Sequence, residues 1–205
     1  MALGLAAAVA APPPTLTPAE ALARKVEARH RGLTDLTARF VQSYRSGVLG
    51  REVTERGTLS LKPPGRMLWE YREPERKTFV SDGRRFYFYV PAEKQVIVRE
   101  QADLRGVPAL LLAGRGDLLA QFSVTLGEGA APGLRRLVLV PRKPDPELEQ
   151  AVLDVDTTDR IHGIVVLDTQ GNRSRFRFDD IRENVGLRDR VFQFQVPRGV
   201  EVISG

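Results

Sequence analysis

The chain of 205 residues contains no cysteine. This absence excludes disulfides, thiolate metal sites, a cysteine nucleophile and lipid attachment to an N-terminal cysteine. Histidine is scarce as well, since only His30 and His162 occur. Neither lies near a nucleophile-elbow sequence, and no predicted helix carries two histidines at metal-ligand spacing. We therefore predict that the protein is not an enzyme and that it needs no metal or cofactor.

No apolar run approaches the roughly 20 residues that a membrane-spanning helix needs. The longest one, residues 1–11, is rich in alanine and ends in the A-x-A pattern Ala8-Val9-Ala10. This pattern is typical of the apolar segment and cleavage site of a secretory signal. We expect residues 1–11 to be a signal-peptide remnant and residues 12–205 to form a single domain. The alternative for residues 1–11 is a disordered tail.

Basic residues outnumber acidic ones, which gives the chain a net charge of +5 and a pI near 9.9. A basic protein can attract acidic partners such as nucleic acid or anionic lipid headgroups. A nucleic-acid footprint needs a basic stripe. Here the basic residues are spread evenly, and the longest runs are pairs such as Arg84-Arg85. We therefore predict no nucleic-acid partner.

The first regular element is a helix over residues 18–31. Thr17 occupies the N-cap, Pro18 the first helical position, and Glu20 completes a capping box. Apolar residues follow at helical spacing, and Gly32 ends the helix. A single apolar stripe on a charged helix indicates that it packs across a sheet.

From Asp35 onward the hydrophobic period changes from helical to two, which is typical of antiparallel strands. Pro63-Pro64-Gly65 and Asp82-Gly83 mark tight turns between strands. Residues 107–112 and 117–119 interrupt the pattern and read as two short helices with glycine breaks. Strands return at 122–126, 134–141, 150–156, 161–169 and 173–179, and 191–203 closes the chain.

These elements predict a mainly β (α+β) fold. About ten or eleven antiparallel strands form an unclosed barrel, with an N-terminal helix and short mid-chain helices that act as a lid. Several strands carry large apolar side chains on one face. For any one of them ordinary core is the simpler role, but as a set they could line a cavity. The set comprises Phe40, Leu59, Leu61, Met67, Trp69, Tyr71, Phe86 and Phe88.

A cluster of carboxylates near the end of one predicted strand is a candidate calcium site. Asp154, Asp156 and Asp159 lie close together beside Thr157 and Thr158. The spacing of a calcium-binding loop is absent. The polar end of a hairpin therefore explains these residues better.

An ordered series of short motifs resembles the LolA family of periplasmic outer-membrane lipoprotein carrier proteins. The series runs through nearly the whole chain, and no single piece of it is specific. It consists of Phe40-Val41-Gln42, Gly57 to Pro64, Trp69-Glu70-Tyr71, Val80 to Gly83, Tyr87-Phe88-Tyr89, Gln95, Pro108 to Leu112, Phe192-Gln193-Phe194 and Pro197 to Val200.

The resemblance implies a monomeric periplasmic carrier whose apolar cavity holds lipoprotein acyl chains. Such a carrier takes lipoproteins from an inner-membrane ABC-type exporter and delivers them to a receptor at the outer membrane. The lid over the cavity would consist of Pro108, Leu110, Leu111 and Leu112. The well-studied branch of the family has a latch arginine just before the turn proline, where this chain has Pro63. Lys62 and Arg66 flank this position and are candidates for a latch or a partner contact.

Three other functions remain open. One is a periplasmic sensor, or another lipid-binding protein, with the same fold. Another is the lipid-anchored receptor, which the lack of cysteine disfavours. The last is a secreted hydrolase, for which no nucleophile and base are found together.

Overall fold

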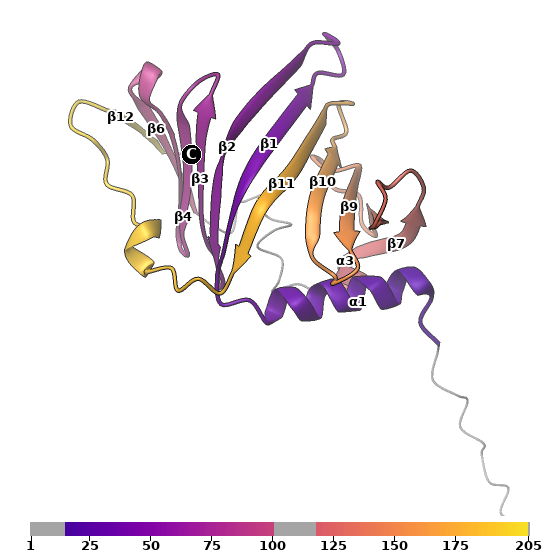
Figure 1. The fold of residues 1–205 in the computed structure, drawn as a ribbon. Helices are drawn as coiled ribbons and strands as arrows, with labels where there is room; N and C mark the ends of the chain where they lie inside the picture. The colour runs from indigo at the N-terminus through magenta and orange to yellow at the C-terminus, as the bar shows by residue number, and fades with distance from the viewer. Residues whose placement is uncertain (1–14, 101–117, 205) are drawn as a thin grey trace, which may run out of the picture.

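A computed structural model describes residues 15–100 and 118–204 of the chain. It shows a mainly β protein built on one 12-stranded sheet of order β12-β6-β5-β4-β3-β2-β1-β11-β10-β9-β8-β7 (Figure 1). The strands are β1 Leu36–Arg45, β2 Glu52–Lys62, β3 Arg66–Glu73, β4 Lys77–Asp82, β5 Arg85–Val90, β6 Gln95–Glu100, β7 Phe122–Gly127, β8 Leu134–Pro141, β9 Gln150–Asp156, β10 Ile161–Leu167, β11 Arg173–Glu183 and β12 Glu201–Ser204. The helices are α1 Pro18–Arg31, α3 Leu118–Gln121 and the 3₁₀ turns η1 Pro91–Glu93 and η4 Asp189–Phe192.

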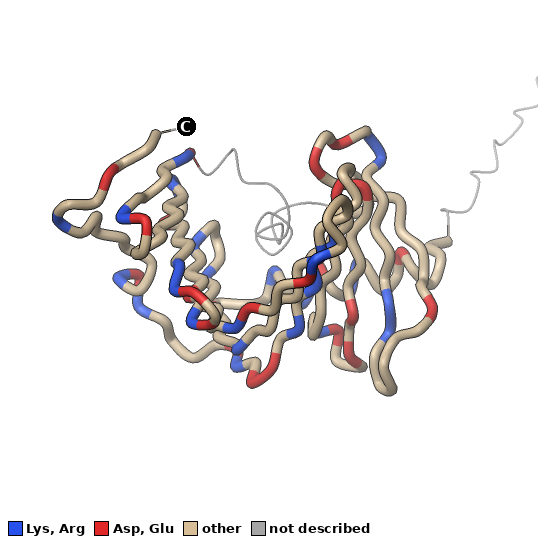
Figure 2. Tube along the Cα trace, turned by 90° about the horizontal axis from the view of Figure 1, so that it is seen from above, with Lys and Arg blue, Asp and Glu red and all other residues tan. Residues whose placement is uncertain are grey.

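The sheet curves strongly without closing, as the view from above shows (Figure 2). Its edge strands, β12 and β7, stand at opposite ends of the strand order. Neighbouring strands pair antiparallel throughout, except that β12 pairs parallel with β6. The prediction of an unclosed, mostly antiparallel sheet is confirmed.

Helix α1 begins and ends where the sequence predicts. The Thr17 side chain accepts a hydrogen bond from the backbone of Glu20, and the Glu20 side chain accepts one from the backbone of Thr17. Gly32 follows as the C-cap. The helix packs against β7, β8 and α3 at one end of the strands (Figure 1). No helix within the described ranges is long and apolar enough to cross a membrane.

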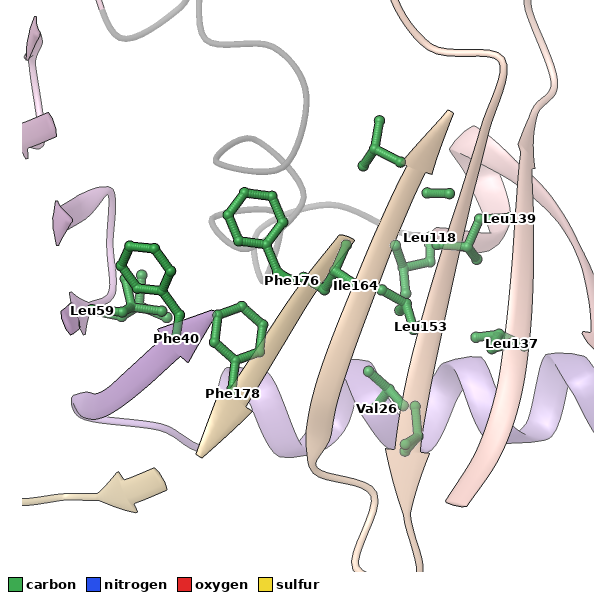
Figure 3. Close-up of a cluster of buried hydrophobic side chains, with 14 of the residues drawn as sticks. Val26, Phe40, Leu59, Leu118, Leu137, Leu139, Leu153, Ile164, Phe176 and Phe178 are labelled. Carbon is green, nitrogen blue, oxygen red and sulfur yellow. The ribbon is translucent and has the colours of Figure 1, made fainter. Parts of the chain in front are cut away.

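The core lies between α1 and one face of the sheet, which we call the inner face. Side chains from β1, β8, β9, β10 and β11 meet Val26 of α1 and Leu118 of α3 there (Figure 3). Strand alternation places every second residue on this face. The opposite, outer face is polar over much of its area, which is the usual division of a half-buried antiparallel sheet.

The described residues form a sheet of 12 strands, where the sequence predicts about ten or eleven. Residues 191–203, which close the chain, contain η4 first, and only Glu201–Ser204 is extended. Pro197 lacks the N–H that a strand needs, and Gly199 adopts a positive φ of 75°.

The C-terminal segment crosses the outer face before it joins the sheet. Phe192 is fully buried, and the ring of Phe194 lies 5.3 Å from Tyr87 and 5.7 Å from Tyr89. After this crossing the chain reaches the free edge of β6 at the end where β6 begins, since Glu201 pairs with Gln95. β12 therefore runs in the same direction as β6, and the last pairing is parallel.

Candidate functional site

The eight residues predicted to line a cavity all lie on the inner face of β1, β2, β3 and β5. Six of them belong to the main buried core, where Met67 is 0% and Trp69 is 2% exposed. Phe86 is buried and Phe88 is half-buried. The structure therefore brings the set together, whereas the sequence alone left open whether the residues are core or cavity lining.

Strand register explains why these side chains meet. Leu59 pairs with Trp69, and Leu61 pairs with Met67, across β2 and β3. Directly opposite residues in antiparallel strands point to the same side. The indole N–H of Trp69 donates to the Met67 sulfur at 3.2 Å, so even its polar atom is satisfied within the cluster.

Three phenylalanines that the sequence did not single out complete this surface. Phe176 and Phe178 of β11 approach Trp69 with ring centroids 5.3 and 6.2 Å away. Phe79 of β4 stacks on Phe88 at 4.3 Å. The period-two alternation of Phe176 and Phe178 was visible in the sequence. What was not visible was the pairing of β11 with β1, because these strands are far apart along the chain.

A pocket opens between the C-terminal half of α1 and the inner face. It encloses about 40 Å³, which holds on the order of three water molecules. Two members of the predicted set, Leu59 and Leu61, lie in its wall. The apolar wall is formed by Val26, Leu33, Leu36, Ala38, Leu59, Leu61, Ile161, Phe178 and Ile181, and the polar rim by Arg29, His30, Asp159, Arg160 and Glu183.

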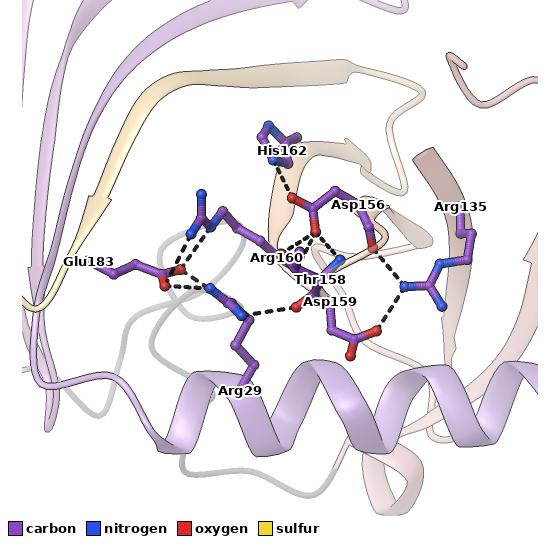
Figure 4. Close-up of polar contacts among 8 residues, drawn as sticks. All are labelled: Arg29, Arg135, Asp156, Thr158, Asp159, Arg160, His162 and Glu183. Carbon is purple, nitrogen blue, oxygen red and sulfur yellow. Dashed lines mark hydrogen bonds and ion pairs between the residues drawn. The ribbon is translucent and has the colours of Figure 1, made fainter. Parts of the chain in front are cut away.

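An ion cluster at this rim ties α1 to the sheet (Figure 4). Glu183 of β11 accepts hydrogen bonds from Arg29 of α1 and from Arg160, which precedes β10. Arg29 also donates to the carbonyl of Thr158 at 2.9 Å. Because Glu183 is only 12% exposed in its side chain, water screens the pairs weakly. We call these three residues the Glu183 clamp.

The neighbouring carboxylates form the end of the β9–β10 hairpin, as predicted. Asp156 accepts hydrogen bonds from Thr158, from the backbone of Arg160 and from His162. Burial alone would raise the pKa of Asp156, but these hydrogen bonds outweigh burial and hold the pKa well below its usual range. Asp159 takes a left-handed conformation with a φ of 66° and pairs with Arg135. These residues therefore build a turn.

At the far end of the inner face, away from α1, the apolar surface gives way to polar groups. The Tyr71 hydroxyl donates to Gln42 at 2.6 Å, and Lys77 pairs with Glu55 while lying 4.5 Å from the centre of the Tyr71 ring. Burial, with the nearby charge of Glu55, raises the pKa of Tyr71 well above its usual range. The site thus has an apolar floor and two polar ends.

Lys62 and Arg66, the candidate latch residues, contact the C-terminal segment. Lys62 donates to the carbonyl of Leu187 and to Asp189, and Arg66 lies 3.5 Å from Asp189. The hydrogen bond from Lys62 lowers the pKa of Asp189. The predicted lid residues Pro108, Leu110, Leu111 and Leu112 lie outside the described residues, so the lid stays a prediction.

The Glu183 clamp leads to a prediction about stability. Replacing Glu183 with glutamine should lower the free energy of unfolding by about 1–3 kcal/mol, because two arginines then lose their shared anion. Chemical denaturation monitored by circular dichroism measures this change. Glu201→Gln is the matched control, since Glu201 is exposed and should change stability by less than about 0.5 kcal/mol. Equal effects of the two substitutions would show that the clamp does not hold α1.

Comparison with known proteins identifies the family. The family model for the outer membrane lipoprotein carrier protein LolA matches residues 31–195. An outer-membrane lipoprotein carrier protein of Chromohalobacter salexigens is 32% identical over 183 residues, covering 88% of this chain and 86% of that protein. One from Pseudomonas aeruginosa is 32% identical over 171 residues, covering 82% and 81%.

A solved structure supports the same fold. An uncharacterized conserved protein from Thermus thermophilus superposes with a TM-score of 0.60 at 14% identity, covering 92% of this chain and 100% of that one. At this identity the likeness speaks for the fold alone. The family match and the two sequence relatives go further, and on their strength the chain belongs to the LolA family of outer-membrane lipoprotein carrier proteins.

Proposed function

We propose that this protein carries lipoproteins through the periplasm with their acyl chains held between α1 and the inner face of the sheet. The observation that supports the proposal most is the apolar pocket under α1, whose lining residues Leu59 and Phe178 also belong to the buried cluster around Trp69. Burial of acyl chains contributes about 0.8 kcal/mol per methylene. Aromatic side chains with Met67 adapt readily to flexible chains.

The pocket is too small for an acyl chain in the conformation described here. A volume of about 40 Å³ admits a few methylene groups at most. We propose that α1, with the elements packed on it, moves away from the sheet as an acyl chain enters this pocket. The Glu183 clamp would then set how readily the site opens, and the hand-over needs only a difference in binding free energy between donor and acceptor.

The proposed partners follow from the family. Cargo would come from an inner-membrane ABC-type exporter and pass to a receptor, or directly to the outer membrane. The carrier would act as a monomer and without a catalytic step. Lys62 and Arg66 are proposed as partner contacts because they lie at the β2–β3 turn. Both side chains pair with Asp189 but stay partly exposed.

Export leads to a second prediction. Residues 1 to about 11 should be absent from the mature protein, which should begin near Ala11 or Pro12, because the segment resembles a signal peptide and its cleavage site. N-terminal sequencing of protein from the periplasm of a Gram-negative host checks this. Recovery of the intact chain, beginning at Met1, from the cytoplasm would contradict it.

Native mass spectrometry of the protein isolated from a periplasmic extract tests the carrier function. We expect masses that correspond to the protein bound to a lipoprotein or its lipidated fragment. A ligand-free protein under all conditions would instead favour a sensor of the same fold. Delipidated lipoprotein serves as the control and should not bind.

A further inference from the structure

The two most exposed aliphatic side chains of the described residues lie side by side at the tip of the β1–β2 hairpin. Val48 is 85% and Leu49 is 71% exposed. The hairpin joins the two long strands at the centre of the sheet, and its tip lies at the end opposite α1 (Figure 1). Scattered single apolar residues on a surface need no explanation, but an adjacent pair at a protruding tip is a candidate contact.

The tip has a defined conformation. Gly50 donates its backbone N–H to the carbonyl of Ser46, and the N–H of Leu49 bonds the Ser46 hydroxyl. Gly47 packs directly on Gly171 of the neighbouring β10–β11 turn and donates to Asn172 at 3.0 Å. These bonds hold Val48 and Leu49 outward, so their exposure is built into the hairpin.

Four arginines lie in or beside the strands next to this apolar pair. Arg45 and Arg51 flank the tip along the chain, and Arg173 lies directly opposite Arg45 in the pairing of β1 with β11. Arg175 follows Arg173 on the same face of β11. Like charges on directly opposite residues destabilise a sheet, so the Arg45–Arg173 pair is poorly explained by folding.

The arginine charges are largely uncompensated. Within the described part of the chain, the side chains of Arg45, Arg51, Arg173 and Arg175 have no hydrogen-bond or ion-pair partner, and all four residues are exposed. Two carboxylates lie nearby. Glu52 is the register partner of Arg45 between β1 and β2 but forms no ion pair with it, and Asp168 is engaged by Asn172 and the turn backbone.

We propose that this tip, residues 46–51 with the four arginines, docks the protein on the surface of an anionic phospholipid bilayer. Two protruding aliphatic side chains with basic groups behind them suit an interface in which apolar atoms enter the headgroup region and guanidinium groups bind phosphates. An acidic protein would explain the arginines but not two aliphatic side chains projecting beyond them. The proposal adds a membrane contact to the carrier function.

Vesicle binding by the cargo-free protein tests the inference independently of acyl-chain carriage. We expect binding to phosphatidylcholine vesicles that contain phosphatidylglycerol, weaker binding without it, and a decline as salt rises. Val48→Ser with Leu49→Ser should reduce the affinity by roughly 10-fold or more. The control Leu126→Ser with Val185→Ser removes two exposed aliphatic side chains at the other end of the sheet and should bind like the wild type.

A spectroscopic probe reports where the membrane contacts the protein. Because the chain has no cysteine, Val48→Cys can be labelled at one position with an environment-sensitive dye. Its emission should shift to the blue on phosphatidylglycerol vesicles, whereas a label at Arg84→Cys, in the β4–β5 turn at the opposite end, should not shift. No binding to anionic vesicles at low salt, or unchanged binding by the double serine variant, would overturn the proposal. Loss of vesicle binding through Arg45→Gln with Arg173→Gln but not through the serine variant would also overturn it, because charge alone would then attract the vesicles without a contribution from Val48 and Leu49.

Discussion

Replacing Gly57 with alanine should lower the free energy of unfolding substantially. A Cβ atom at this position would lie 2.1 Å from the backbone oxygen of Glu70 and 2.7 Å from the ring of Phe40. The first of these is backbone of the neighbouring strand β3 and cannot rotate away. The ring of Phe40 covers the glycine because Phe40 and Gly57 are directly paired in β1 and β2. We expect a loss of about 3 kcal/mol, the upper part of the usual range for overpacking.

Thermal unfolding measures this loss, and the midpoint should fall by roughly 6–12 °C for a chain of this size. Gly32→Ala provides the matched control, since a Cβ there meets only carbonyl oxygens at 3.4 Å or more. Its midpoint should stay close to that of the wild type. If both variants unfold alike, the close approach of β2, β3 and Phe40 is not a real constraint.

Replacing Leu59 with glutamate should abolish acyl-chain binding. Leu59 is 2% exposed and lies both in the pocket wall and opposite Trp69. A carboxylate at this point would have to enter an apolar site at a cost of several kcal/mol, or be hydrated by water that competes with the acyl chain. Binding of a lipopeptide, measured by isothermal titration calorimetry, should become undetectable.

The neighbouring residue, Ser60, provides a control that differs in the face of the sheet to which its side chain points. Ser60→Glu adds the same charge one position along β2, where the side chain points to the outer face. It should bind the lipopeptide like the wild type. Because Leu59→Glu could also weaken the fold, Leu59→Asn serves as a milder variant with circular dichroism as a check on folding. A folded Leu59→Asn protein with unchanged affinity would place the acyl chains elsewhere.

The sequence was most informative where structure depends on neighbours along the chain. The capping box at Thr17 fixed the start of α1, and Asp82-Gly83 gave the β4–β5 hairpin, where Gly83 has a φ of 99°. Strand alternation placed Met67 and Trp69 on one face. Each of these features needs only residues a few positions apart, so local patterns suffice to predict it.

Features that join distant segments could not be predicted in this way. The Glu183 clamp combines α1 with the β9–β10 turn and the end of β11, and nothing in the local sequence of Arg29 indicates its partner. The same holds for Phe176 beside Trp69, which depends on the pairing of β1 with β11. The parallel β12 escaped prediction because Val191–Phe194 alternates like a strand while Phe192 and Phe194 pack on the sheet from outside.

Quenching of Trp69 by a spin-labelled lipopeptide tests the central claim most directly. Trp69 is the only tryptophan of the chain, so the fluorescence signal has a single source. It lies at the centre of the aromatic surface, 4.9 Å from the ring of Phe40. If acyl chains bind between α1 and the inner face, a nitroxide on the chain should quench the emission strongly, and an unlabelled lipopeptide should shift it without quenching. Unchanged Trp69 emission under conditions where calorimetry shows full binding would contradict the account.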